Sequence, residues 1–333
     1  MEKGRRAAVA LTFNGKGASK DIAPYLEEFT FTDVATGGSD EVSMTLNNTD
    51  MRFLKAWKPL KGMKISAGII TKNWNRADDK KIMRCGKFVT DDLTGAYPPS
   101  TFTIKAVSAP VRSEFKDRER TKTYKGATIK SIAAKIAKRA GVKLHYEAGK
   151  IKIKEVEQSK EADSSFLSSL CEEYGLGLKI YNNKIVIYDE EKYENKPPVA
   201  TIERKGGKVT DWEWNTTLQR TYTCAKVTYT DSDSNKKNKA KVGKKGRTLT
   251  ASVTAYSKKD AKLKAEALLR SANKTRTTMI ISTDAIPGLY ATAVIKLSGF
   301  GKASGNYFVD TVTHTLSGES GYEMQLELHK LPV

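Results

Sequence analysis

Histidine is the residue type in this chain best suited to proton chemistry, and only three are present among 333 residues. One of them, His314, lies in GNYFVDTVTHTLSGESGYEMQLEL, a run of strand-forming residues from Gly305 to Leu328. A catalytic histidine needs a positioned partner, such as a nucleophile or a pair of acids. The surrounding sequence offers neither, and it has no HxxxH spacing for a metal. We therefore predict that His314 is a structural residue of a strand.

Other motifs with known chemistry are also missing. The sequence has no GxxxxGK[ST] loop, no GxGxxG turn after a strand and no HExxH pair. Cys85, Cys171 and Cys224 lie far apart without CxxC spacing, which argues against a disulfide framework or a zinc site. The segment DSDSN from Asp231 lacks the glycine and the terminal glutamate of a calcium loop. We expect no catalytic residue, no metal and no cofactor.

The strongest chemical signal is charge, since the formal net charge is +20. The segment NKKNKAKVGKKGR, from Asn235 to Arg247, carries seven basic residues and no acid. These residues are Lys236, Lys237, Lys239, Lys241, Lys244, Lys245 and Arg247. Strands are expected on both sides, so we predict a long hairpin loop. It is either simply solvated or a docking loop for an acidic protein or a nucleic acid.

Two other function classes compete with a structural role. A nucleic-acid-binding β-barrel needs aromatic residues among its lysines and arginines. The segment KIKIKEVE, from Lys150, alternates lysines but has no aromatic residue, so a nucleic-acid partner is disfavoured. An enzyme such as a peptidoglycan hydrolase would need a Glu or Cys/His constellation that is missing. No stretch approaches the ~18 apolar residues of a membrane helix, so we expect no membrane partner.

The elements that must position these residues are mostly strands. In EVSMTLNN, Val42, Met44 and Leu46 alternate with polar residues, which is typical of a half-buried strand. MKISAGII, GKFVTDDL and STFTIKAV continue this style, and Asp50 can cap a short helix that carries Trp57. Many short strands with polar turns indicate a barrel or a sandwich.

The periodicity changes in the middle of the chain. GATIKSIAAKIAKRAG has one apolar helical stripe and ends at Gly141, and a second helix begins at Asp163 or Ser164. Each helix is followed by two strands, and Asn182-Asn183 is suited to a tight turn. The remainder is again β, apart from a helix capped at Ser257 that should turn Leu263, Ala267 and Leu268 inward.

An internal repeat connects the two β-rich regions. PLKGMKISAGII followed by GKFVTDDL and STFTIKAV parallels IPGLYATAVIKL followed by GNYFVDTVTHTL and GYEMQLEL. Matching Phe88-Val89 to Phe308-Val309 places His314 at Thr94 or its neighbour. We interpret this as a duplicated β-barrel split by an insert, with convergence of hairpins as the alternative.

The fold class predicted is therefore α+β and mainly β, with two small β-barrels separated by a helix-strand-strand repeat insert. Residues 1–115 should form the first barrel and residues 116–195 the insert. Residues 196–333 should form the second barrel, with one helix and the long basic loop.

With these elements in place, the chain resembles the baseplate hub proteins of contractile phage tails and tail-like bacteriocins, the late control protein D family. Three stretches carry the resemblance: EVSMTLNNTDMRFLKAW, the region from GKFVTDDL to GVKLHY, and the close GKASGNYFVDTVTHTLSGESGYEMQLEL. Together they span nearly the whole chain. One departure is Ala291-Thr-Ala293, where the family pattern has a glycine-bearing turn.

The resemblance implies a homotrimer whose six barrels adapt a sixfold tail tube to a threefold central spike. The implied partners are the tail tube protein, the spike protein, other baseplate (wedge) proteins and the tape measure protein. The implied location is the baseplate of a phage or tail-like particle, assembled in the bacterial cytoplasm. Because the chain stops after the last barrel strand, a separate spike protein is expected.

Overall fold

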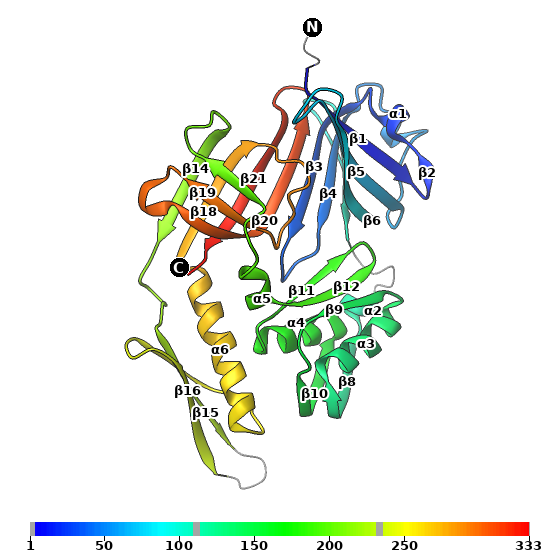
Figure 1. Ribbon diagram of the computed structural model, residues 1–333. Coiled ribbons are helices and arrows are strands. Elements are labelled where there is room, and N and C mark those ends of the chain that lie inside the picture. The colour runs from blue at the N-terminus through cyan, green and yellow to red at the C-terminus, as the bar shows by residue number, and fades with distance from the viewer. Residues whose placement is uncertain (1–3, 109–113, 231–235, 333) are drawn as a thin grey trace.

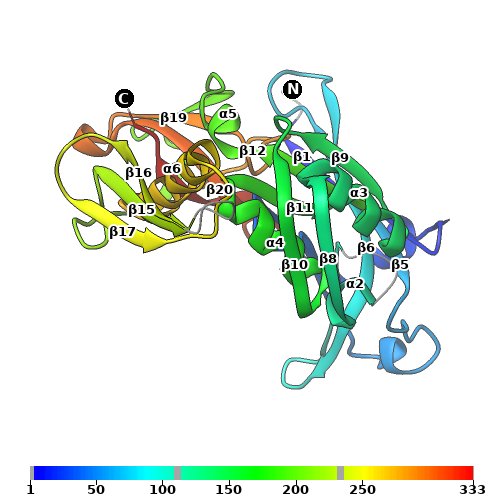
Figure 2. The same ribbon diagram turned by 90° about the horizontal axis from the view of Figure 1, so that it is seen from below.

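The computed structural model describes residues 4–108, 114–230 and 236–332, and the strands dominate it. A large sheet crosses one end of the molecule, and two smaller units lie beside each other below it (Figure 1). The view from below separates these two units, with the insert on one side and a helix with three strands on the other (Figure 2). The acidic segment DSDSN, residues 231–235, lies outside the described residues. The expected class, α+β and mainly β, is confirmed.

The large sheet has thirteen strands from both ends of the chain. They are β1 (Arg6–Phe13), β2 (Lys16–Gly17), β3 (Leu26–Val34), β4 (Glu41–Asn47), β5 (Lys64–Lys72), β6 (Lys80–Ala96), β7 (Thr101–Val107), β13 (Ala200–Glu203), β14 (Val209–Thr216), β18 (Thr277–Asp284), β19 (Val294–Ser298), β20 (Gly305–Ser317) and β21 (Gly321–Lys330). Short helices α1 (Ser19–Ile22), η1 (Arg52–Leu54) and η2 (Gly301–Ala303) connect some of them. The β3–β20 pair joins the N-terminal and C-terminal halves into one hydrogen-bonded sheet.

The two halves of this sheet have the same strand order. In the first half the neighbours run β3-β4-β7-β6-β5-β1, and in the second half they run β14-β18-β21-β20-β19-β13. If the six strands of each half are numbered by their order in the chain, both halves have the same arrangement of these numbers across the sheet. The outer pair differs in direction, because β1 is antiparallel to β5 whereas β13 is parallel to β19. The internal repeat inferred from the sequence is therefore present as a repeated topology.

Strand pairing gives the residue equivalences of the repeat. The irregularity in β6 falls between Thr90 and Asp92, and that in β20 between Val309 and Thr311. Aligning these bulges matches Gly86 with Gly305, which both have positive φ, 123° and 140°. The sequence match of Phe88-Val89 with Phe308-Val309 is therefore wrong by one residue, because motif letters cannot locate a bulge. His314 corresponds to Gly95, the neighbour of Thr94.

The turn before β5 and β19 follows the same correspondence. Gly62 has φ 81° and donates its N–H to the carbonyl of Thr90, and Thr292 has φ 73° and donates to the carbonyl of Val309. Both hydrogen bonds measure 2.9 Å. The second half therefore keeps the left-handed turn without the glycine, which accounts for the departure at Ala291-Thr-Ala293.

Each half of the large sheet has its own apolar core. The first contains Phe29, Phe31, Val42, Met44 and Ile104, and the second contains Met279, Ile281, Leu326 and other side chains of β18 to β21. The two cores come together at β3 and β20, since Leu316 belongs to the first core and Ala35 to the second. Alternating burial along these strands follows the period of two seen in the sequence.

The insert is an independent α+β unit. Its elements are α2 (Glu114–Asp117), β8 (Glu119–Thr128), α3 (Ile129–Ala140), β9 (Lys143–Glu147), β10 (Lys152–Ala162), α4 (Asp163–Glu173), β11 (Leu176–Tyr181), β12 (Lys184–Asp189) and α5 (Glu190–Glu194). The predicted end of α3 at Gly141, with φ 70°, and the predicted start of α4 at Asp163 are confirmed, and Thr128 caps α3. The helix expected after Asp50 is only the short 3-10 helix η1, which ends at Leu54 and does not include Trp57. Strand β8, which pairs with β10, was not predicted because its exposed, lysine-rich sequence lacks an apolar alternation.

The last unit comprises β15 (Cys224–Thr230), β16 (Lys237–Gly243), β17 (Thr248–Ser252) and α6 (Lys258–Lys274). Its three strands form a sheet of their own in the order β16-β15-β17, and α6 packs on one face. The prediction that these strands continue the second β-rich region is therefore wrong. So is the prediction of a basic hairpin loop, because β16 runs through the middle of it. Asn238, Ala240 and Val242 alternate with lysines, which is the strand signal that the charge concealed.

Candidate assembly site

The seven basic residues predicted to dock a partner lie along β16 and its turn into β17. Lys237, Lys239 and Lys241 are on the strand itself. Lys236 precedes it, and Lys244, Lys245 and Arg247 follow it. All seven are exposed, and none forms an ion pair with a described residue. The structure therefore keeps these residues together but places three of them on a regular surface.

The outer face of this sheet, opposite α6, is entirely polar. On β16 it presents Lys237, Lys239 and Lys241, and the residues opposite them on β15 are Thr230, Thr228 and Lys226. On β17 it presents Thr248, Thr250 and Ser252, all exposed. The inner face holds Ala225, Val227, Tyr229 and Ala240 against α6. We call the outer face, with its lysines and hydroxyls, the basic sheet face.

One pair on the basic sheet face is unfavourable by itself. Lys226 and Lys241 are direct partners across β15 and β16. Like charges in directly opposite positions destabilise a sheet. Edge strands often carry lysines because charge hinders pairing with other chains, and this explains the lysines of β16. Lys226 lies on the central strand, so edge protection does not account for it.

Arg247 differs from the lysines because its guanidinium is occupied within the chain. It donates to the carbonyl of Leu218 and, at 3.4 Å, to the hydroxyl of Thr221. It also lies 6.0 Å from the ring centre of Tyr222. Arg247 therefore ties the β16–β17 turn to the segment that enters β15, and the six lysines remain as the free charges of the predicted set.

Polar contacts through α6 fix this unit to the insert. Tyr174 donates its hydroxyl to Asp260 at 2.9 Å, and Lys264 donates to Glu173 at 3.0 Å. Lys274 also donates to Glu190 at 2.7 Å. Asp260 and Lys264, on α6, are 3% and 5% exposed, whereas the Glu173 carboxylate keeps contact with water. Burial, and then the charge of Asp260, raise the pKa of Tyr174 well above its ordinary value.

The sequence did not indicate this helix interface. Leu263 was expected to point inward but is 37% exposed, whereas Lys264, one residue later, is buried. The reason is that α6 faces both its own sheet and the insert, so its buried surface includes a cation with an acidic partner. Leu268 is half-buried against the unit's core, as expected, whereas Ala267 is buried beside Gly175 of the insert.

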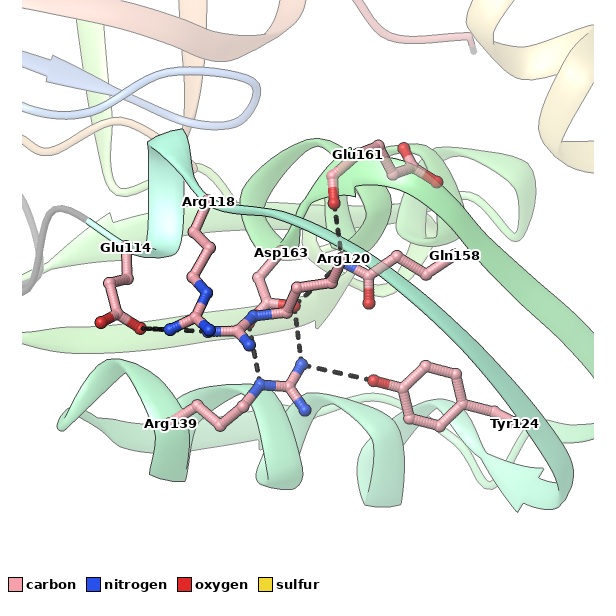
Figure 3. Close-up of polar contacts among 8 residues, drawn as sticks. All are labelled: Glu114, Arg118, Arg120, Tyr124, Arg139, Gln158, Glu161 and Asp163. Atoms are coloured by element: carbon pink, nitrogen blue, oxygen red, sulfur yellow. Dashed lines mark hydrogen bonds and ion pairs between the residues drawn. The ribbon is translucent and has the colours of Figure 1, made fainter.

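Within the insert, Asp163 is the centre of a polar network (Figure 3). Arg139 on α3 donates to both of its oxygens, at 3.0 and 2.6 Å, and Gln158 donates at 3.0 Å. Arg120 on β8 lies 3.6 Å from the same carboxylate and 3.1 Å from Glu114. The hydrogen bonds with Asp163 raise the pKa of Arg139 further. This carboxylate is surrounded by donors, so it joins four elements and is not available as a general base.

A second buried charge cluster lies where the insert meets the large sheet. Lys179 on β11 contacts Asp33 on β3, and it lies 3.2 Å from Asp40. Asp33 in turn accepts the backbone N–H of Ala291 at 2.9 Å. Burial, and then the nearby charge of Asp33, raise the pKa of Asp40 to about 8. Lys179 therefore connects the insert with the first half of the sheet, and Asp33 continues the contact to Ala291 of the second half.

His314 is a core residue, as predicted. Its Nε2–H donates to the carbonyl of Leu289 at 2.9 Å, which leaves Nδ1 to accept the hydroxyl of Tyr322 at 2.9 Å. The ring stacks on Phe31 with a centroid distance of 6.0 Å. Burial lowers the pKa of His314 to about 4, so the imidazole is neutral. Its contacts hold β20 to β3 and β21.

Among the described residues, no group of three or more His, Cys, Asp or Glu side chains is placed to hold a metal ion. All three cysteines are free and buried, including Cys171 on the apolar side of α4. No helix in the described part of the chain is long and apolar enough to cross a membrane.

Comparison with known proteins points to a single family. A family model described as phage tail baseplate hub (GPD) matches residues 108–320, which is well over half of the chain. A probable baseplate hub protein of Escherichia phage 186 is 25% identical over 181 residues, covering 54% of this chain and 44% of that protein. The corresponding protein of Escherichia phage P2 is 27% identical over 204 residues, covering 59% and 50%. The chain thus spans about half the length of the curated relatives it matches.

A solved structure has the same fold along almost its entire length. A tail protein from Neisseria meningitidis MC58 superposes with a TM-score of 0.73, covering 98% of this chain and 97% of that one. Their sequence identity is 14%, so the likeness is one of fold.

Proposed function

The chain belongs to the phage tail baseplate hub family, and from this premise we propose that it is a structural hub that forms a homotrimer. The trimer would adapt a sixfold tail tube to a threefold central spike in the baseplate of a phage or tail-like particle. Its partners would be the tube, spike, wedge and tape measure proteins, with assembly in the bacterial cytoplasm. It would act through its surfaces and not as an enzyme.

The repeated strand order is the observation that carries this proposal. Each chain holds two copies of one six-strand arrangement, joined through β3 and β20. Three such chains would present six similar surfaces, which is what contact with a sixfold tube requires. We infer that each half curls into a small barrel in the assembled hub, with β3 still paired to β20. The division into residues 1–115, 116–195 and 196–333 belongs to the same proposal, with β15, β16, β17 and α6 as a separate unit inside the third range.

The oligomeric state tests the hub proposal directly. We expect the purified chain to have a native mass three times that of its 36.8 kDa protomer. Light scattering during size-exclusion chromatography over a range of concentrations would measure it. A monomer or dimer at every concentration, also in the presence of the spike protein, would rule out the trimeric hub.

We further propose that the basic sheet face docks onto an acidic neighbouring protein of the baseplate. The supporting features are six exposed lysines without an internal ion pair and the costly Lys226–Lys241 juxtaposition. Arg247, the seventh predicted residue, would keep the turn in shape. Between complementary charged surfaces, steering raises association rates and is weakened by salt.

A charge-matched pair of variants tests this docking. The triple variant K237Q/K239Q/K241Q should assemble into particles more slowly, with reduced sensitivity to salt, because it neutralises the face. The control K258Q/K259Q/K262Q removes equal charge from exposed positions on α6 of the same unit. Particle yield at low and high salt, counted by electron microscopy, gives the comparison. Equal yields for the two variants at low salt would contradict the docking role.

A further inference from the structure

The two outer strands of the last unit differ in charge. Strand β15 lies in the middle of its sheet, with β16 on one side and β17 on the other (Figure 2). The edge strand β16 carries Lys237, Lys239 and Lys241. The other edge strand, β17, has the sequence TLTAS, and no residue from Thr248 to Ser257 is charged. Because charge on an edge strand hinders the addition of another chain, β17 is the edge of this sheet that remains open to one.

The hydrogen bonds of β17 show which of its backbone groups face the open edge. Val253, directly after β17, donates its N–H to the carbonyl of Thr228 on β15 at 2.9 Å. Successive residues of a strand direct their backbone groups to opposite edges, so every second residue of β17 turns its N–H and C=O groups outward. These residues are Thr248, Thr250 and Ser252. Among the described residues β17 pairs only with β15, so these groups are available to an added strand.

The side chains of β17 suit an added strand with two different faces. Leu249 and Ala251 pack against the core under α6 but are only half-buried, so each keeps apolar surface at the edge. Thr250 lies on the basic sheet face directly beside Lys226, and Lys226 lies beside Lys241. An added strand would therefore need apolar side chains on one face and would meet positive charge on the other.

Lys226 gives this edge its charge complementarity. The side chain is half-buried and forms no ion pair with a described residue. Neighbouring strands lie about 4.8 Å apart, so an added strand would be two such spacings from β15. A glutamate opposite Thr250 would then reach the Lys226 ammonium across the shorter threonine side chain. This contact would offset the repulsion between Lys226 and Lys241, for which edge protection gives no reason.

We propose that an acidic neighbouring protein of the baseplate binds by adding a β-strand to the open edge of β17. Apolar residues would alternate with glutamate or aspartate along that strand, with one acid opposite Thr250. Backbone hydrogen bonds to the outward groups of β17 supply affinity, and the alternation fixes which face turns toward α6. The inference rests on the proposed docking of the basic sheet face and adds the edge, the binding mode and the chemistry of the partner segment.

A proline at the edge tests this strand addition. Since the N–H of Thr250 faces outward, T250P keeps the pairing with β15 but removes one donor and places a ring in the path of the added strand. T250V is the matched control, because it loses the hydroxyl and keeps the N–H. The probe is a fluorescein-labelled heptapeptide, Thr-Val-Glu-Val-Glu-Val-Thr, whose binding to the full chain is measured by fluorescence anisotropy. T250P should weaken binding by about tenfold or more, and T250V should stay within about twofold of wild type.

Charge and hydrogen exchange give two further readouts with wild type. The same peptide with glutamine in place of glutamate should bind more weakly, because it cannot neutralise Lys226. The bound acidic peptide should slow amide exchange at Thr248, Thr250 and Ser252. Exchange at Leu249 should change little, because its N–H already faces β15. Circular dichroism checks the fold of T250P, and if that variant does not fold, the exchange pattern of wild type decides.

Three results would overturn the strand addition. They are no binding of the acidic peptide to wild type, equal binding by T250P and wild type, and a loss in T250V as large as that in T250P. If one of them occurs while K237Q/K239Q/K241Q still slows particle assembly, the basic sheet face docks without an added strand. Equal particle yields for that triple variant and its control overturn both proposals.

Discussion

Thr292 and Gly62 are equivalent residues in the turns before β19 and β5, and different residue types adopt the same backbone conformation there. Both have positive φ and both donate their N–H to the strand that carries the bulge. A β-branched residue in the left-handed region carries backbone strain that glycine does not. The second half of the chain therefore holds a strained position that the first half has avoided.

Substitutions at these two positions should have opposite effects. T292G should increase the free energy of unfolding by about 1 kcal/mol, because the relieved strain exceeds the added entropy of the unfolded chain. G62A should decrease it by about the same amount or more, since alanine is disfavoured at φ 81°. Urea unfolding followed by fluorescence measures both. A destabilised T292G variant would show that Thr292 makes a compensating contact.

His329 should make the free energy of unfolding decrease as the pH rises above about 6.5. Burial disfavours its charge, but the hydrogen bonds with Asp310 and the carboxylate of Glu194, 3.6 Å from Nε2, outweigh burial and raise the pKa of His329 to about 9. A folded-state pKa above the ordinary 6.5 means that the charged form stabilises the fold fully below about pH 6.5. This contribution, up to about 3 kcal/mol, is lost as the pH rises through 9.

The variant H329Q tests this linkage because glutamine cannot titrate. Wild type should lose stability between pH 6.5 and 9 more steeply than H329Q, as measured by denaturant midpoints across that range. Parallel pH profiles for the two proteins would mean that His329 is neutral in the fold.

At the scale of elements, β16 is the clearest difference between expectation and structure. Its lysines suggested a mobile loop, yet Asn238, Ala240 and Val242 mark a regular alternation. Helices α3 and α4 were predicted within a residue or two because caps and apolar stripes are local signals. Strand β16 was missed because its core-facing side chains are small. They become buried only because α6 packs over them.

A pair of neighbouring substitutions distinguishes a strand from a loop at this place. A240D would bury an unpaired carboxylate against α6 and should lower the free energy of unfolding by about 3 kcal/mol or more. K239D lies on the exposed face and should change it by about 0.5 kcal/mol or less. Thermal unfolding followed by circular dichroism reports both. Similar effects at the two positions would contradict the alternation.

At the scale of the whole molecule, Lys179 links the insert to the first half of the large sheet, and through Asp33 to the second half. Removing one member of a buried charge cluster leaves the others without compensation, at a cost of about 3–5 kcal/mol. We expect K179M to destabilise the chain by this amount and to let the insert unfold before the sheet. Lys184, exposed on the adjacent strand β12, provides the control K184M. Differential scanning calorimetry should show two transitions for K179M only, and one shared transition would limit Lys179 to a local role.

What the sequence determined by itself is the local content of the molecule. Alternation identified the strands of the large sheet, caps and stripes identified the helices, and the lack of a partner motif near His314 favoured a structural role for it. The repeat was also visible, because duplicated strands keep their turns and their order. These signals depend on residues close together in the chain, which is why they could be read directly.

What only the tertiary structure decided is how distant residues meet. The bulges that set the repeat's register, the β3–β20 joint, the buried Lys179 and Lys264 and the basic sheet face all depend on contacts between residues far apart in the chain. Such contacts carry no local periodicity, because a charge or a small side chain is buried only when another element covers it.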